Sequence, residues 1–277
     1  MTDPSLLNDA APQNDRSLPL DGRLALVTGA AAGIGRSISE RFHADGATVL
    51  AADIDDTGLR ALADELGDRI VPMHCDVTSV ESLAEVGAEA ERRGGLHVAV
   101  ANAGRGTFSS IIDHPLAEWQ AIIDLCLTGV FLTVQQSAKV MCDGGSIITI
   151  SSLNGTQPSA GMSAYCTAKA GVIMLTQVAA MELGERGIRV NSIAPGLVET
   201  NATGAFWMVP GVVEEFVDNT TVGRFAQPGD VAAMAAFLAG PESTFISGSL
   251  FRVDGGASTK RYPDLPRAFS RFSQPAG

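Results

Sequence analysis

Short apolar runs alternate with longer segments of helical periodicity along most of the chain. Runs rich in β-branched residues predict strands at residues 24–28, 48–53, 70–76, 97–102, 146–151, 188–194 and 250–253. Apolar positions three or four residues apart predict helices at residues 33–44, 57–66, 80–92, 116–141, 165–183 and 228–238. Strands that alternate with helices form right-handed βαβ units around a parallel sheet. We therefore expect one doubly wound α/β domain of about seven parallel strands with helices on both faces.

Segments outside this rhythm mark the ends of the domain and one insertion. Residues 1–20 are polar, which predicts a disordered N-terminal tail before one folded domain at 21–256. Residues 199–227 contain the apolar run Phe206-Trp207-Met208, and we expect this segment to be a substrate lid. Residues 257–277 hold four basic residues against one acid and are expected to form a C-terminal tail.

Composition narrows the classes of function. The chain has 277 residues and a formal net charge of -12, which argues against nucleic acid or an anionic membrane as a partner. Its four cysteines lack the spacing of metal ligands, so we expect reduced thiols and no metal site. We find no signal peptide and no apolar run long enough to span a bilayer, which favours the cytoplasm.

A glycine-rich loop follows the first predicted strand and opens a helix. Gly29, Gly33, Ile34 and Gly35 stand in the spacing GxxxGxG. Glycines let the backbone approach a pyrophosphate, while the helix N-terminus offers unpaired N–H groups and the positive end of its dipole. The loop predicts a dinucleotide site, although a glycine-rich turn can also be a plain strand-to-helix connection.

Polar side chains end the next three predicted strands. Asp53 ends the second, where a carboxylate accepts hydrogen bonds from the adenosine ribose and repels a 2′-phosphate. Ala32 stands in the loop where a basic side chain would meet that phosphate, so both residues favour NAD over NADP. Asp76 and Asn102 end the third and fourth strands and by position border the adenine and the nicotinamide ribose. Asp53 could also be a solvated strand-end acid, and Asn102 a turn former before glycine.

Tyr165 and Lys169 lie four residues apart in a predicted helix, so their side chains share one face. A cation there lowers the pKa of a phenol, and a fall of ~3 units from about 10 needs roughly 4 kcal/mol of preferential stabilisation of the phenolate. Such a tyrosine exchanges a proton with an alcohol at neutral pH. The pair also arises by chance in helices, so its meaning depends on the residues around it.

Taken in order, these motifs resemble the short-chain dehydrogenase/reductase family in its single-domain form. The residues that carry the resemblance are 28–35, 75–77, 102–104, Ser152, Tyr165 with Lys169, 189–191, Pro195 with Gly196, and 254–256. The resemblance covers about residues 21–256. It implies a Rossmann-type domain, a nicotinamide cofactor, a homotetramer, and the interconversion of an alcohol and a ketone.

The resemblance also implies roles for single residues. Ser152 would hold the substrate oxygen, and Tyr165 would act as the general base in oxidation and the general acid in reduction. Lys169 would stabilise the phenolate and grip the ribose hydroxyls. For the cofactor the resemblance adds Val77, Ala103, Gly104, Tyr165, Lys169, Pro195, Gly196, Val198 and Thr200 to the residues named above.

The chain departs from the family at three positions. Cys126 stands where many members have an asparagine that holds a water near the lysine, and a thiol is a poorer partner for water. No proton-relay role is therefore assigned to Cys126, which is interpreted as a small buried hydrophobic residue. His97 stands where the family often has an acid, and Ala101 where it often has a second asparagine; both are expected to affect sheet packing alone.

The apolar lid favours a hydrophobic secondary alcohol or ketone as the small-molecule partner, with cyclic and steroid-like compounds among the candidates. An alternative is an NADPH-dependent ketoreductase for a carrier-bound or quinone carbonyl, which Asp53 and Ala32 oppose. A sugar-nucleotide epimerase would need a larger C-terminal region. A non-enzymatic NAD-sensing protein would be expected to lack Ser152, Tyr165 or Lys169, and all three are present.

Overall fold

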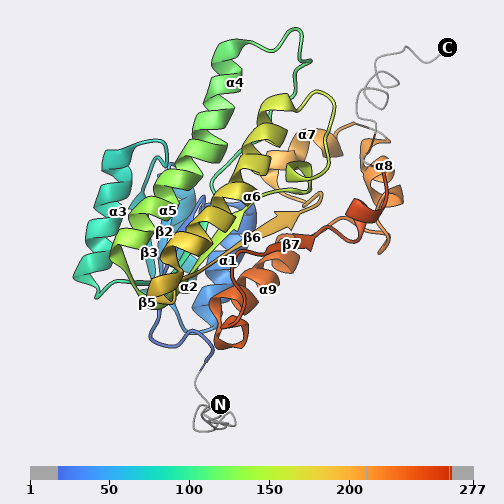
Figure 1. The fold of residues 1–277 in the computed structure, drawn as a ribbon. Coiled ribbons are helices and arrows are strands. Elements are labelled where there is room, and N and C mark those ends of the chain that lie inside the picture. Colours follow the sequence, from blue (N-terminus) through green and yellow to red (C-terminus); the bar gives the residue numbers. More distant parts are fainter. Residues whose placement is uncertain (1–17, 210, 262, 264–277) are drawn as a thin grey trace, which may run out of the picture.

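One parallel sheet organises the computed structural model, which describes residues 18–209, 211–261 and 263 (Figure 1). The strands are β1 (Leu24–Thr28), β2 (Thr48–Asp53), β3 (Ile70–His74), β4 (Leu96–Ala101), β5 (Met141–Ile150), β6 (Arg189–Pro195) and β7 (Leu250–Val253). They lie side by side in the order β3-β2-β1-β4-β5-β6-β7, and every neighbouring pair is parallel. The predicted doubly wound sheet is confirmed. From β1 the chain adds strands first on one side (β2, β3) and then on the other (β4 to β7). Doubly wound sheets have a crevice at this point, outside the carboxyl ends of the strands.

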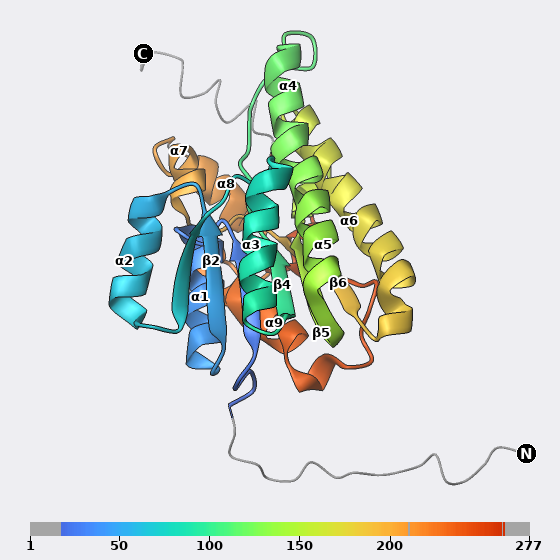
Figure 2. The same ribbon diagram turned by 90° about the vertical axis from the view of Figure 1, so that its left-hand side faces the viewer.

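Two layers of helices bury the sheet. One hydrophobic cluster joins the sheet to α1 (Gly33–Ala44), α2 (Asp56–Leu66) and α9 (Pro228–Ala239). A second cluster joins the opposite face to α3 (Val80–Arg92), α5 (Gly129–Val140) and α6 (Ser163–Leu183), which Figure 2 shows side by side. With both faces covered, the strands read as continuous apolar runs, and all five residues of β1 are buried.

Short elements complete the described part of the chain. They are α4 (Leu116–Ile123), η2 (Asp124–Thr128), η3 (Leu153–Gly155), η4 (Gly184–Arg186), η5 (Asn201–Thr203), α7 (Gly204–Trp207), α8 (Val212–Asp218), η6 (Pro241–Ser243) and η7 (Ala257–Thr259). η2 is a π-helical turn inserted between α4 and α5. The expected continuous helix over 116–141 is therefore three segments, and π-turns of this kind are frequent at functional sites.

β5 begins earlier than the sequence predicted, at Met141 instead of residue 146. Leu96 of β4 pairs with Met141, whereas Val98 pairs with Ser146, so the register shifts between the two pairs. The inserted residues include Gly144 and Gly145, whose pattern is that of a turn. Pairing with β4 makes this segment part of the strand, and the sequence pattern contains no signal for that pairing.

The composite helix Leu116–Val140 is long and apolar enough to cross a membrane by length and composition, in contrast to the expectation from the sequence. It packs along the sheet between α3 and α6. Of its apolar 18-residue stretch, 39% is buried inside the fold. A core helix of a soluble domain has the same length and composition, so this helix is weak evidence for a membrane span.

The expected tails lie largely outside the described residues. Residues 1–17 and 264–277 belong to them, and the boundaries of the tails differ from the prediction at their inner ends. Leu20 is buried in the core, and its N–H donates to Asp45 O at 2.8 Å. Lys260 Nζ donates to Asp218 O and Thr220 O at 2.8 and 3.0 Å, at the end of α8. The folded region therefore extends at least from residue 20 to residue 260.

Candidate active site

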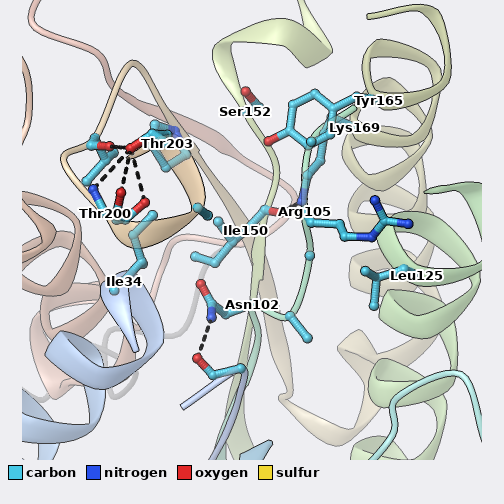
Figure 3. Close-up of a pocket in the computed structure, with 18 of the residues that line it drawn as sticks. Ile34, Asn102, Arg105, Leu125, Ile150, Ser152, Tyr165, Lys169, Thr200 and Thr203 are labelled. Carbon is cyan, nitrogen blue, oxygen red and sulfur yellow. Dashed lines mark hydrogen bonds between the residues drawn. The ribbon is translucent and has the colours of Figure 1, made fainter. Parts of the chain in front are cut away.

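A cavity of about 720 Å³ lies at the carboxyl edge of the sheet, above the point where β1 and β4 diverge. It runs from the glycine-rich loop and Asp53 at one end to Ser152, Tyr165 and the lid at the other. Figure 3 shows the central part, with Ile34 and Asn102 below and Ser152 with Tyr165 above. A crevice of this kind accepts an elongated ligand, such as a dinucleotide, with one end near the side chains of Ser152 and Tyr165.

The glycine-rich loop has no room for larger side chains. Gly29 has φ +67°, and a Cβ there would lie 2.8 Å from Asn102 Nδ2. At Gly35 a Cβ would lie 2.0 Å from Gly29 O, so this glycine lets α1 start directly against the loop. Ala32 precedes α1 and gives no side-chain cap to the first N–H groups of the helix. Those donors, close to an accessible backbone, fit a pyrophosphate.

Asp53 connects the end of β2 to the loop. Its Oδ2 accepts from Ala31 N at 3.0 Å, and its Oδ1 accepts from Asp55 N at 3.0 Å. Each carboxylate oxygen has two lone pairs, so both can still accept a hydrogen bond from a ligand hydroxyl. The side chain therefore lines the cavity as a fixed double acceptor.

Asn102 ties β4 to β1 below the cavity. Its amide Nδ2 donates to Thr28 O at 2.9 Å and to Gly29 O at 3.2 Å, and one hydrogen bond of this amide is drawn in Figure 3. Thr28 Oγ1 accepts from the N–H groups of Asn102 and Ala103 at 3.0 and 3.2 Å. The amide thus supports the loop and also lines the cavity.

Asp76 stands at the same edge on the far side of β2. The hydroxyl and backbone N–H of Thr78 donate to Asp76 Oδ1 at 2.7 and 2.9 Å. These hydrogen bonds hold the pKa of Asp76 below its usual range. The carboxylate therefore stays charged well below neutral pH and remains an acceptor beside the cavity.

Ser152, Tyr165 and Lys169 come together at the other end. Ser152 follows β5 and is buried, and its Oγ accepts from Asn154 N at 3.1 Å. Tyr165 and Lys169 lie in the first half of α6, with Lys169 Nζ 5.6 Å from the centroid of the tyrosine ring. In Figure 3 the oxygens of Ser152 and Tyr165 face the same part of the cavity. An alcohol or carbonyl oxygen placed there can contact both hydroxyls.

Lys169 is deeply buried. It is 3% exposed, and its Nζ donates to the backbone oxygen of Ile150 at 2.7 Å. Burial lowers the pKa of Lys169, while the nearby Cys126 raises it. A buried cation with one neutral acceptor is expensive, which is typical of a residue kept for chemistry and not for stability.

Cys126 sits at the middle of the π-turn and is fully buried. Its Sγ donates to Arg105 O at 3.3 Å. A Cβ at Gly104 would lie 3.4 Å from this sulfur and 3.6 Å from Lys169 Nζ, so Gly104 leaves room between the two groups. The expected interpretation as a small buried residue fits this position. Arg105 itself points toward Leu125 and away from Ser152 and Tyr165 (Figure 3).

Apolar side chains form the wall opposite the hydroxyls of Ser152 and Tyr165. Met162, Val212 and Phe216 cluster with Phe206 and Leu197, against one side of Tyr165. The rings of Phe206 and Phe216 lie 5.9 Å apart, and both residues line the cavity. Leu153 and Phe108 extend this apolar lining. The wall suits a hydrophobic substrate.

The segment expected to be a lid contains η5, α7 and α8. It begins after β6 and returns to the body through an isolated bridge between Val198 and Ala226. Phe206 of α7 and Phe216 of α8 cover the cavity, while Met208 is exposed. Pro210, which lies within the expected lid, is outside the described residues.

Most of the residues predicted from the sequence line this one cavity. They are Gly29, Gly33, Ile34, Asp53, Asp76, Val77, Asn102, Ala103, Gly104, Ser152, Tyr165, Lys169, Pro195, Gly196, Val198 and Thr200. Gly35 does not line it, because it lies behind Gly29 and acts through packing. Sequence reasoning missed Ile150, whose backbone oxygen holds the lysine, and Thr203, for which the spacing Thr200-x-x-Thr203 at a helix start was an available signal. No group of three or more metal-ligating side chains occurs among the described residues.

Comparison with known proteins agrees with this geometry. A profile of the family described as Enoyl-(Acyl carrier protein) reductase matches residues 29–258. The chain is 42% identical over 240 residues to a 3-alpha-(or 20-beta)-hydroxysteroid dehydrogenase of Mycobacterium tuberculosis, covering 86% of this chain and 90% of that protein. It is 39% identical over 245 residues to a trans-4-hydroxycyclohexanecarboxylate dehydrogenase of Sinomonas cyclohexanicum, covering 84% and 92%.

Among solved structures, a short-chain type dehydrogenase/reductase from Mycobacterium ulcerans superposes with a TM-score of 0.88 at 30% identity. The match covers 92% of this chain and 96% of the other. Both sequence relatives and this structure are matched over nearly their whole length. This chain therefore belongs to the short-chain dehydrogenase/reductase family.

Proposed function

We propose that this protein is an NAD-dependent dehydrogenase that interconverts a hydrophobic secondary alcohol and its ketone. Family membership makes the chain an oxidoreductase that uses a nicotinamide cofactor, NAD or NADP, on an alcohol or ketone. The observation that carries the finer proposal is one cavity with Asp53 at its adenosine end and Ser152, Tyr165 and an apolar wall at its other end.

The chemistry of oxidation follows from the three side chains. Ser152 Oγ donates to the substrate oxygen and holds it in reach of Tyr165. Tyr165, as phenolate, takes the hydroxyl proton of the alcohol, and the positive charge of Lys169 favours that phenolate. The nicotinamide, when bound, accepts the hydride that leaves the carbinol carbon. In reduction Tyr165 returns the proton to the ketone oxygen.

The preference for NAD rests on the charges around the adenosine end. Asp53 presents a carboxylate fixed by Ala31 N and Asp55 N. Among the described residues that line the cavity, the only basic side chains are Lys169 and Arg105, at the nicotinamide end. A 2′-phosphate next to Asp53 would meet a negative charge and find no cation to offset it.

The substrate class rests on the apolar wall and on two relatives. Phe206, Phe216, Met162 and Leu153 surround the space next to Ser152 and Tyr165. Two relatives carry names that specify cyclic alcohols, a hydroxysteroid and a hydroxycyclohexanecarboxylate. A cyclic secondary alcohol is therefore the first class to test.

The assembly proposed for this chain is a homotetramer in the cytoplasm. Four apolar side chains on the outer faces of α5 and α6 support an assembly, because they are 42–82% exposed: Phe131, Met174, Val178 and Met181. Exposed apolar side chains on neighbouring helices are commonly covered by another subunit.

A second candidate is an NADPH-dependent ketoreductase for a carrier-bound carbonyl. The matching family profile, described as Enoyl-(Acyl carrier protein) reductase, names a carrier-bound substrate, and a 35% identical relative is named a 3-oxoacyl-[acyl-carrier-protein] reductase. The carboxylate of Asp53 opposes this candidate. A non-enzymatic NAD-binding role has no support, because Ser152, Tyr165 and Lys169 are all present.

The test is a panel of cyclic, steroid and linear secondary alcohols, read by the absorbance of NADH or NADPH as each forms. We expect turnover with NAD and cyclic alcohols, and little with NADP. Tyr165→Phe is the matched control, because it removes one oxygen and keeps the ring. Wild-type activity with none of the alcohols or corresponding ketones, or full activity of Tyr165→Phe, would refute the proposed function.

A further inference from the structure

The hydroxyl of Thr203 holds together the loop that connects β6 to α7. Thr203 Oγ1 donates to Val198 O at 2.7 Å, with Thr200 O at 3.0 Å as a second acceptor. It accepts from Thr200 N at 3.1 Å (Figure 3). It also accepts from Trp207 Nε1 at 3.3 Å. A hydroxyl has one hydrogen to donate and two lone pairs that accept. These contacts therefore use the full capacity of Thr203.

Thr200 is oriented by this arrangement. Its Oγ1 lies 3.3 Å from Thr203 Oγ1, which has no further lone pair to offer. Thr200 Oγ1 also accepts from Thr203 N in the capping box of η5. Among the residues that the structure describes, its own hydrogen has no acceptor other than Thr203 Oγ1, and the side chain lines the cavity. A Cβ at Gly33 would lie 3.1 Å from Thr200 Cγ2, so the methyl group rests on the glycine-rich loop. The Thr200 hydrogen is left for a ligand in the cavity.

Trp207 is the second side chain that the Thr203 hydroxyl holds in place, after Thr200. Its indole N–H donates to Thr203, and its ring packs edge-on against Phe225 with centroids 4.5 Å apart. Phe206, the preceding residue of α7, lines the substrate end of the cavity and contacts Phe216. Because Phe206 and Trp207 share one short helix, the position of Trp207 sets that of Phe206.

We propose that Thr203 is a positioning residue that links the two ends of the site. Through Thr200 it shapes the surface that receives the coenzyme, and through Trp207 it places the aromatic wall that faces the substrate. The inference rests on the proposed function in that the cavity must take a nicotinamide coenzyme. If Thr203 were only a cap for η5, its loss would lower stability and leave the two ligands equally well bound.

Three variants separate the contacts of Thr203 with Thr200 from its contact with Trp207. Thr203→Val keeps the shape of the side chain and removes the hydroxyl, while Thr203→Ser keeps the hydroxyl and removes the methyl group. Trp207→Phe removes the indole N–H and leaves the contacts with Thr200 and Val198 in place. Each variant is measured for the Kd of NADH, for kcat, and for the KM of the best alcohol in the panel, after its melting temperature has been checked.

We expect Thr203→Val to raise the Kd of NADH about tenfold, because two or more hydrogen bonds of ordinary net strength are lost. Thr203→Ser should stay within about twofold of wild type, which is rescue by the conservative variant. Trp207→Phe should raise the KM of the alcohol about fivefold and change the Kd of NADH by less than about twofold. In all three, kcat at saturation should change less than the binding constants.

Trp207 also provides a measurement that needs neither coenzyme nor turnover. The chain has two tryptophans, and Trp119→Phe leaves Trp207 as the single emitter. In that background, acrylamide should quench Trp207 more strongly in Thr203→Val than in Thr203→Ser, because the indole has lost its acceptor.

Three results would overturn the proposal: Thr203→Val binding NADH like wild type, Thr203→Ser losing as much affinity as Thr203→Val, or equal quenching of Trp207 in both. Should Thr203→Val not fold, Trp207→Phe still tests the proposal. An unchanged KM for the alcohol in that variant would contradict the claim that Thr203 places the aromatic wall through Trp207. A wild-type protein that binds neither NADH nor NADPH refutes the proposed function itself, whatever the Thr203 variants do.

Discussion

Replacing Asp53 by asparagine should remove the preference for NAD. The two side chains have the same shape, but the amide is neutral and keeps one acceptor oxygen in place of two. In the wild type, Asp53 faces the cavity with both oxygens free to accept from a ribose. In the variant, one of the N–H groups of Ala31 and Asp55 would face an NH₂ group.

The size of the effect follows from Coulomb's law. A 2′-phosphate of charge about −1.5 to −2 would lie about 5 Å from the carboxylate, and an effective dielectric of about 40 suits a crevice open to water. The repulsion is then about 2.5–3.3 kcal/mol, or roughly a hundredfold in affinity. Loss of the charge also weakens the hydrogen bonds to the ribose, which should cost NADH about tenfold.

The assay is titration of the protein with NADH and with NADPH, followed by the fluorescence of the reduced nicotinamide. The Kd of NADPH divided by the Kd of NADH should fall from about a hundred in wild type to below about five in Asp53→Asn. Asp56→Asn is the matched control, because it removes the same charge three residues away at a side chain that does not line the cavity. A wild type that binds both coenzymes equally, or a ratio that Asp53→Asn leaves unchanged, would refute the reasoning.

Three further predictions concern the catalytic end and the sheet. Tyr165→Phe should lower kcat about a thousandfold and leave the Kd of NADH within about twofold, because only the proton-transfer group is lost; stopped-flow and binding titration measure the two. Cys126→Asn should raise turnover and alter the pH-rate profile if the thiol limits the proton path, at a cost of about 1–3 kcal/mol in stability for the larger polar group. An unchanged profile, with Cys126→Ser as the control, would show that this residue does not limit the relay. His97 Nδ1 accepts from Leu24 N at 3.1 Å, and burial lowers the pKa of His97. Because that pKa lies below the unfolded value of about 6.5, the contribution to stability is present above about pH 6.5 and is lost as the pH falls. Melting curves from pH 7.5 to 5 should therefore show a smaller loss of stability in His97→Gln than in wild type, and parallel curves would contradict the role of His97.

The sequence predicted the fold well where one pattern decided each element. β1, β2 and β7 have the expected bounds, because their apolar runs end at polar residues or glycines that stop the strand. The π-turn Asp124–Thr128 was not predicted, since its residues continue the apolar pattern of α4 into α5. One inserted residue in a helix changes the hydrogen bonding without changing the local composition.

The site was predicted to a similar degree. Ser152, Tyr165 and Lys169 carry distinctive side chains at distinctive positions, and they line one cavity. Contacts through the backbone were invisible, because the oxygen of Ile150 that holds Lys169 could belong to any residue type. Thr203 was missed for a related reason. Its four neighbours are backbone groups and side chains of the same short loop, and their directions depend on how the loop folds.

The hydrogen bonds from the Asn102 side chain to the backbone of Thr28 and Gly29 have a consequence for the rates of coenzyme binding. The side chain fixes the floor of the crevice through hydrogen bonds between strands, so the floor has its binding shape before any coenzyme arrives. The roof is the surface loop after β6, which is held by the hydroxyl of Thr203 and by backbone hydrogen bonds to Ala226. The coenzyme can therefore make its first contact with the floor of the crevice with little further ordering of the protein. Its dissociation requires the loop that forms the roof to move away. The association rate of the coenzyme should therefore be insensitive to substitutions in the roof, and its dissociation rate, measured by displacement in a stopped-flow instrument, should carry nearly all of their effect.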